Sequence, residues 1–69
     1  MKNPDELVQE IHIDYVLHNY SFPEEEVLKA IAKLKGNGTH LCEAALFADY
    51  AGITLAEAVE DHIKAYGVS

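Results

Sequence analysis

Apolar residues recur at intervals of three and four positions along most of this 69-residue chain, which is the spacing of one face of an α-helix. The clearest example lies in residues 21–36. Its apolar stripe consists of Val27, Leu28, Ile31 and Leu34. Three glutamates precede the stripe and two lysines stand near its end, which suits the positive and negative ends of a helix dipole. Ser21 and Glu24 have the spacing of a capping box and Gly36 is a typical stop signal, so a helix is predicted between them.

Capping and stopping residues divide the rest of the chain into three further helices. The expected N-terminal caps of these helices are Asn3, Thr39 and Thr54. The third helix is expected to run over residues 40–50, and Gly67 is expected to end the fourth. Residues 1–69 therefore predict a single all-α domain, a small orthogonal bundle of four helices with short connections.

The first helix carries apolar side chains on two sides. One side consists of Leu7, Val8, Ile11 and Tyr15, and the opposite side of Ile13, Val16, Leu17 and Tyr20. Such a helix is either enclosed by a core or shared with a partner, and so small a chain has little to enclose it. Residues 11–17 also alternate as a half-buried strand would, so part of this helix has a strand alternative. The cap at Asn3 and the absence of a breaker favour the helix.

The chain is acidic, with a net charge of −7 and no arginine. An acidic surface repels phosphate, and only arginine offers a bidentate fork for guanine or phosphate, so nucleic-acid binding is disfavoured. No apolar run approaches the ~20 residues of a membrane helix, so no membrane association is expected. The single cysteine, Cys42, and the lack of an apolar signal segment near the N-terminus predict a cytoplasmic protein.

Residues that could bind metals or act in catalysis are scattered along the chain. The four histidines are His12, His18, His40 and His62. Their spacing matches no familiar zinc pattern, and His62 is expected to be a hydrogen-bonded histidine of the core. Cys42 stands in the first turn of the expected third helix, where the helix dipole would lower the pKa of its thiol. No orienting partner for a nucleophile stands out, so the sequence predicts no enzyme, no catalytic residue, no metal and no cofactor.

Part of the chain resembles a known family of helical binding domains. The resemblance rests on Tyr20 to Ile31, on Gly36-Asn37-Gly38 and on Cys42 to Phe47. These segments are similar to a ubiquitin-associated (UBA-like) domain, with its acidic helix start, its Asn/Gly turn and its pair of large apolar residues. The resemblance implies a compact helical bundle that binds ubiquitin through Tyr20, Ser21, Phe22, Leu46 and Phe47. Tyr20 and Ser21 stand where the family has methionine and glycine, and the fourth helix is additional.

Residues 48–59 resemble a second type of domain. Ala48 stands four residues before Gly52, as in helix-turn-helix proteins, and the segment from Gly52 to Val59 is similar to the helical part of ribbon-helix-helix repressors. Both resemblances imply a dimeric DNA-binding regulator, and the second would need the strand alternative of the first helix. The expected recognition helix is nevertheless acidic, with Glu57, Glu60 and Asp61.

The function predicted from these patterns is a non-enzymatic protein-protein interaction module that docks a partner through exposed apolar helical surface. Its partner would be another protein, with ubiquitin as one candidate, or a second copy of the chain. The surface would combine the C-terminal side of the first helix with nearby residues, namely Ile13, Val16, Leu17, Tyr20, Phe22, Leu46 and Phe47. Two alternatives are the dimeric DNA-binding regulator and an acidic inhibitor that occupies a basic nucleic-acid-binding groove on its target.

Overall fold

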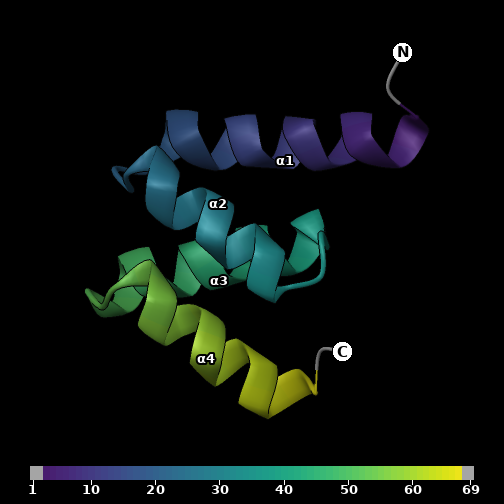
Figure 1. The fold of residues 1–69 in the computed structure, drawn as a ribbon. Coiled ribbons are helices and arrows are strands. Elements are labelled where there is room, and N and C mark those ends of the chain that lie inside the picture. Colours follow the sequence, from purple (N-terminus) through teal and green to yellow (C-terminus); the bar gives the residue numbers. More distant parts are fainter. Residues whose placement is uncertain (1–2, 68–69) are drawn as a thin grey trace.

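The computed structural model describes residues 3–67, and this range contains four helices and no strand. The helices are α1 (Pro4–Asn19), α2 (Glu24–Lys33), α3 (Gly38–Ala51) and α4 (Leu55–Tyr66) (Figure 1). The predicted all-α class is confirmed there, and residues 1–2 and 68–69 of the expected domain lie outside the described residues. Residues 11–17 lie wholly within α1, so the strand alternative is wrong. A helix satisfies its backbone hydrogen bonds within one segment, whereas a strand needs a partner strand.

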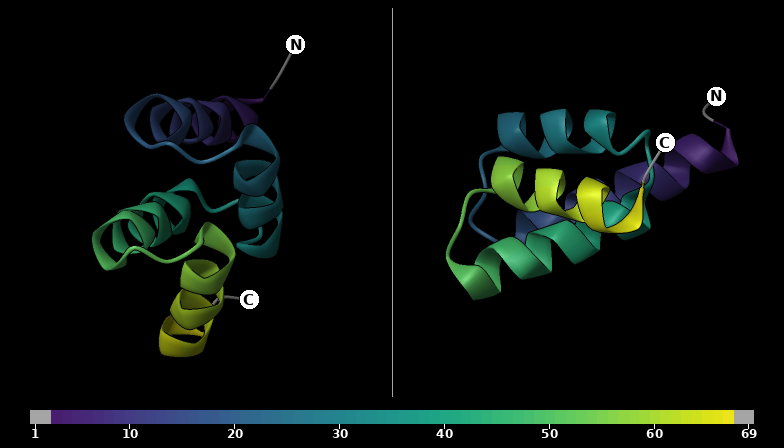
Figure 2. Two further views of the ribbon diagram at one scale, coloured as in Figure 1. Left: turned by 90° about the vertical axis from the view of Figure 1, so that its left-hand side faces the viewer. Right: turned by 90° about the horizontal axis from the view of Figure 1, so that it is seen from below.

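The helices α1 and α4 lie at opposite ends of the molecule, with α2 and α3 between them (Figure 1). Each outer helix, α1 or α4, packs against both α2 and α3. The left view of Figure 2 shows α2 and α3 as two separate helices side by side. The molecule measures 37 × 26 × 16 Å. Since one helix with its side chains is about 10–12 Å across, the thinnest dimension leaves little room for an interior. Among the described residues, none of the helices combines the length and the apolar character that crossing a membrane requires.

The core is built from small and medium-sized apolar side chains. Within residues 3–67 it comprises twelve buried apolar residues, namely Val16, Val27, Ala30, Ile31, Leu34, Leu41, Ala44, Ala45, Ala48, Leu55, Ala58 and Val59. Five of them are alanine, and three of these lie on α3, which lets neighbouring helices approach it closely. All six aromatic side chains lie within the described residues, and none is buried. Four of the six, Tyr15, Phe47, Tyr50 and Tyr66, are exposed, and Tyr20 and Phe22 are half-buried.

Two expected helix caps are confirmed. The Asn3 side chain accepts a hydrogen bond from the backbone N–H of Glu6 at 2.9 Å. Thr54 accepts a hydrogen bond from the backbone N–H of Glu57 at 3.1 Å. Gly67 ends α4 in the left-handed conformation, with φ of 63°, as its position predicts.

The other two expected caps are wrong. Ser21 does not cap α2, because Pro23 occupies the cap position and no side chain makes a capping hydrogen bond. Three glutamates in the first turn instead lie at the positive end of the helix dipole. The helix α3 begins earlier than expected, and Asn37 rather than Thr39 accepts the hydrogen bond from the backbone N–H of His40 at 3.1 Å. In both places several capping residues stand side by side, and the path of the chain decides which of them acts.

The turn between α2 and α3 is a contact surface for α1. The Gln9 side-chain amide donates a hydrogen bond to the backbone oxygen of Gly36 at 3.3 Å. A Cβ atom added at Gly38 would lie 2.6 Å from Cβ of His12 and nearer still to the imidazole ring. Gly36 has φ of 77° and closes the end of α2, so its lack of a side chain serves both the turn and the contact.

Candidate functional site

The seven expected partner-binding residues differ widely in exposure. Val16 is fully buried in the core, so it cannot contact a partner, and its assignment to a docking surface is wrong. Four others are half-buried and pack against the core, namely Ile13, Leu17, Tyr20 and Phe22. Leu46 and Phe47 are exposed, at 60% and 46%. The chosen side of α1 is therefore mainly its inner side.

The opposite side of α1 faces solvent. Its exposed residues, called here the outer stripe, are Leu7, Val8, Ile11 and Tyr15. Each keeps about half or more of its surface exposed, and Ile11 keeps 66%. Both sides of α1 have the same helical spacing, so the periodicity of the sequence could not tell which side turns inward.

A groove with a volume of about 760 Å³ runs between α3 and α4, and we call it the α3–α4 groove. Its large apolar walls consist of Leu46, Phe47 and Tyr50 on α3 and Tyr66 on α4. Ala58 and Ala65 leave space along α4, and His62 lies between them in the sequence. Glu43 and Asp61 add two exposed carboxylates.

Sequence reasoning found two of the four large apolar residues of this groove and missed the other two. Leu46 and Phe47 were expected at a docking surface, whereas Tyr50 and Tyr66 were not, although they are 89% and 68% exposed. The signal for Tyr50 was present, because it follows Leu46 and Phe47 at helical spacing and extends a second stripe beside the buried one. Tyr66 continues the helical spacing of the buried residues Ala58, Val59 and His62, so its spacing does not show that it is exposed at the last position of α4.

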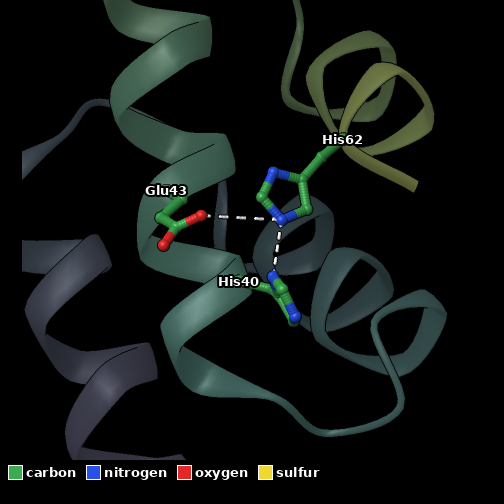
Figure 3. Close-up of side chains that lie close together, drawn as sticks. All are labelled: His40, Glu43 and His62. Carbon is green, nitrogen blue, oxygen red and sulfur yellow. Dashed lines mark hydrogen bonds and ion pairs between the residues drawn. The ribbon is translucent and has the colours of Figure 1, made fainter. Parts of the chain in front are cut away.

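Two histidines from different helices meet beside the groove. Nδ1 of His40 on α3 and Nε2 of His62 on α4 lie 2.6 Å apart and share a hydrogen bond (Figure 3). His62 is only 8% exposed, so the prediction of a hydrogen-bonded core histidine is confirmed. The ring of His62 also packs on Tyr66, with centroids 4.5 Å apart. Burial lowers the pKa of His62, because it disfavours the charged form of the ring, and the nearby His40 lowers it further. Glu43 acts in the opposite direction, because its carboxylate favours the charged ring.

Glu43 brings a carboxylate to the same place. Its Oε2 lies 3.7 Å from Nε2 of His62 (Figure 3). His40 and Glu43 are three positions apart on α3, so they project from the same side of that helix. Within residues 3–67, this is the one group of three side chains whose ligand-type atoms all lie within 4.8 Å of one another. His40 and His62 are 22 positions apart in the sequence, so local spacing could not reveal this group.

Cys42 has a different environment from the one expected. The helix α3 starts at Gly38, which places Cys42 beyond the first turn. Burial raises the pKa of the Cys42 thiol, whereas the position at a helix start was expected to lower it. The thiol is therefore not activated as a nucleophile at neutral pH.

The charged residues exposed on α4 are mainly acidic, with three carboxylates against Lys64. Glu57, Glu60 and Asp61 all face solvent, and the Glu60 carboxylate lies 3.9 Å from the Lys33 ammonium group. A recognition helix of a DNA-binding protein instead presents basic side chains and side-chain amides to the major groove. The charge on α4 therefore opposes contact with a phosphate backbone.

The site thus has two adjoining parts, an open apolar groove and a polar cluster of His40, Glu43 and His62. The groove can hold an apolar segment, and the cluster has the nitrogen and oxygen atoms that bind metal ions.

Comparison with protein family models, with curated proteins and with solved structures finds no match for this chain.

Proposed function

We propose that this chain is a non-enzymatic protein-interaction module that holds a basic, amphipathic helix of a partner protein in the α3–α4 groove. The main support is the exposure of Leu46, Phe47, Tyr50 and Tyr66 around one cavity. Exposed apolar residues that gather in a concave surface are typical of binding sites, whereas isolated ones are common on any protein.

The form of the groove favours a helical occupant. Its α3 wall follows positions 43, 46, 47 and 50, and its α4 wall follows positions 58, 61, 62, 65 and 66. Two neighbouring helices with such stripes form a trough in which the apolar side of a third helix can pack. We therefore expect anchors on the partner at positions i, i+3 or i+4, and i+7.

The charge of the groove favours a basic occupant. Glu43 and Asp61 both line it, and the whole chain carries a net charge of −7. Complementary charge speeds the encounter with a basic partner and disfavours acidic ones. A helix with lysine or arginine beside its apolar anchors fits both features.

The direct test is a two-dimensional NMR titration of the labelled protein with a synthetic helix of leucine and lysine. Leucine is placed at the anchor spacing, and a control peptide has the same composition in scrambled order. We expect chemical shift changes at Leu46, Phe47 and Tyr50 with the first peptide and none of comparable size with the second. Changes confined to Leu7 and Ile11 would place binding on the outer stripe instead and would contradict the proposal.

A matched pair of variants sharpens this test. Phe47→Ser removes an anchor from the groove, and Leu28→Ser removes an apolar side chain of nearly equal exposure from α2, 48% against 46%. We expect Phe47→Ser to weaken binding about tenfold or more, as loss of an aromatic contact at an interface centre does. Leu28→Ser should leave the affinity unchanged, and an equal loss in both variants would indicate nonspecific apolar binding.

Ubiquitin is a second candidate partner. The resemblance to UBA-like domains implies contacts at Tyr20, Phe22 and Leu46. Two observations favour it, since Leu46 is exposed and the half-buried Tyr20 and Phe22 have ring centroids only 5.8 Å apart. Titration with ubiquitin should then shift Tyr20 and Phe22 and leave Tyr66 unchanged, whereas an absence of shifts would remove this candidate.

A further inference from the structure

We infer that His40, Glu43 and His62 form a binding site for one divalent transition metal ion, and that this ion is Zn²⁺. The site lies beside the α3–α4 groove and does not depend on the groove binding a peptide. Imidazole nitrogen and carboxylate oxygen are ordinary zinc ligands, and three protein ligands with one open position are typical of zinc sites that interact with further molecules.

The distances in the cluster are close to those that zinc requires. With metal-ligand bonds of about 2.0–2.1 Å in a tetrahedron, any two ligand atoms lie about 3.3 Å apart. The His40 and His62 nitrogens are 2.6 Å apart, and the Glu43 oxygen is 3.7 Å from the His62 nitrogen. All three atoms already converge within 4.8 Å (Figure 3). Modest rotations of the His40 and Glu43 side chains would bring them to tetrahedral distances.

The protonation of the two rings is compatible with metal binding. In the present hydrogen bond, one of the two facing nitrogens carries the proton and the other presents its lone pair. On zinc binding, that proton moves to the opposite nitrogen of the same ring, so both facing nitrogens present lone pairs. Two neutral imidazoles and an ionised carboxylate then bind the ion without net release of a proton.

The surroundings hold the central ligand in place. His62 is 8% exposed, and its ring packs against both His40 and Tyr66 at centroid distances of 4.7 and 4.5 Å. A side chain fixed in this way loses little conformational freedom when it binds an ion. Glu43 and His62 also line the groove, so an ion held by them would lie near any molecule bound there.

The test is a Zn²⁺ titration of the metal-free full chain, by calorimetry and by competition with a coloured chelator. We expect one ion per chain, with a Kd of about 1 μM or tighter. Glu43→Gln keeps the shape of the side chain and removes the anionic ligand, so it should raise the Kd about tenfold or more. Glu57→Gln is the matched control on α4 and should leave the Kd unchanged.

Two further measurements test the site in the unaltered protein, without any substitution that could unfold the chain. NMR signals of the ring protons of His40 and His62 should shift with Zn²⁺ in the unaltered protein, while those of His12 and His18 should not. Co²⁺ in place of Zn²⁺ should give the visible absorption of a tetrahedral site. Absence of binding at about 100 μM Zn²⁺, or equal weakening by Glu43→Gln and Glu57→Gln, would overturn the proposal. Peptide binding measured with a chelator present tests the groove separately.

Discussion

At the scale of single residues, side-chain size decides how closely the helices approach one another. Gly38 meets His12 of α1, and Gly36 meets Gln9 of the same helix. Glycine at these positions has a local explanation in the sequence, because Asn/Gly segments form turns. Its second role, as a contact surface, depends on a helix that is distant along the chain and becomes visible only in the folded protein.

Replacing Gly38 by alanine should lower the free energy of unfolding by about 2 kcal/mol, because the new Cβ would overlap with His12 and push α1 away. Chemical denaturation followed by circular dichroism measures this change. The double variant Gly38→Ala/His12→Ala removes the imidazole ring and should recover part of the loss. An unchanged free energy of unfolding in the single variant would contradict the close approach of α1.

Cys42 should react slowly with iodoacetamide at neutral pH. Burial raises the pKa of its thiol, so the reactive thiolate is rarer at a given pH than in an exposed cysteine. The reaction rate should increase as the pH rises toward the thiol pKa. The control is a short unfolded peptide with the residues around Cys42, and a faster reaction in the folded protein than in this peptide would contradict the burial of the sulfur.

At the scale of secondary structure, the apolar pattern of α1 does not show which side of the helix is buried. Two apolar stripes run along this helix, and each alone would predict an inner side. The inner one packs Val16 into the core, whereas the outer one leaves Ile11 at 66% exposure. The choice depends on which stripe fits against the stripes of α2 and α3, and that fit involves three segments at once.

A pair of variants tests the orientation of α1. Val16→Ala should lower the free energy of unfolding by about 2 kcal/mol, because it creates a cavity in the core. Ile11→Ala should change it by about 0.5 kcal/mol or less, because the side chain is mainly exposed. Thermal or urea denaturation gives both values, and a reversed order would mean that α1 faces the other way.

A second pair tests the start of α3. Asn37→Ala removes the side chain that caps the helix and should lower the free energy of unfolding by about 1 kcal/mol. Thr39→Ala alters an exposed residue within the first turn and should have little effect. Equal losses would show that Thr39 shares the capping role that the sequence pattern assigned to it.

At the scale of the whole molecule, shape and charge have opposite effects on self-association. The shape leaves apolar residues exposed, which favours association, and the charge opposes it. A body only 16 Å thick cannot enclose all the apolar residues of its helices, so the outer stripe and the walls of the α3–α4 groove remain exposed. The net charge of −7 makes copies of the chain repel one another. Such repulsion opposes aggregation through the exposed apolar residues.

Sedimentation equilibrium should therefore give the mass of a single chain at low salt. Raising the salt to about 1 M shortens the range of charge repulsion to about 3 Å, so weak association through the outer stripe should appear only then. Ile11→Ser should suppress that association. A stable dimer at low salt would show that the outer stripe is a permanent interface and that charge does not control self-association.

The sequence by itself determined the helical class, the approximate extent of the four helices and the caps at Asn3 and Thr54. These features arise from hydrogen bonds and dipoles within a single segment, so the local order of residues is sufficient. Only the tertiary structure decided which side of α1 is buried, that Tyr50 and Tyr66 border a groove, and that His40, Glu43 and His62 meet. Each of these depends on the packing of helices that are distant along the chain, and equal periodicity on two sides of a helix carries no information about that packing.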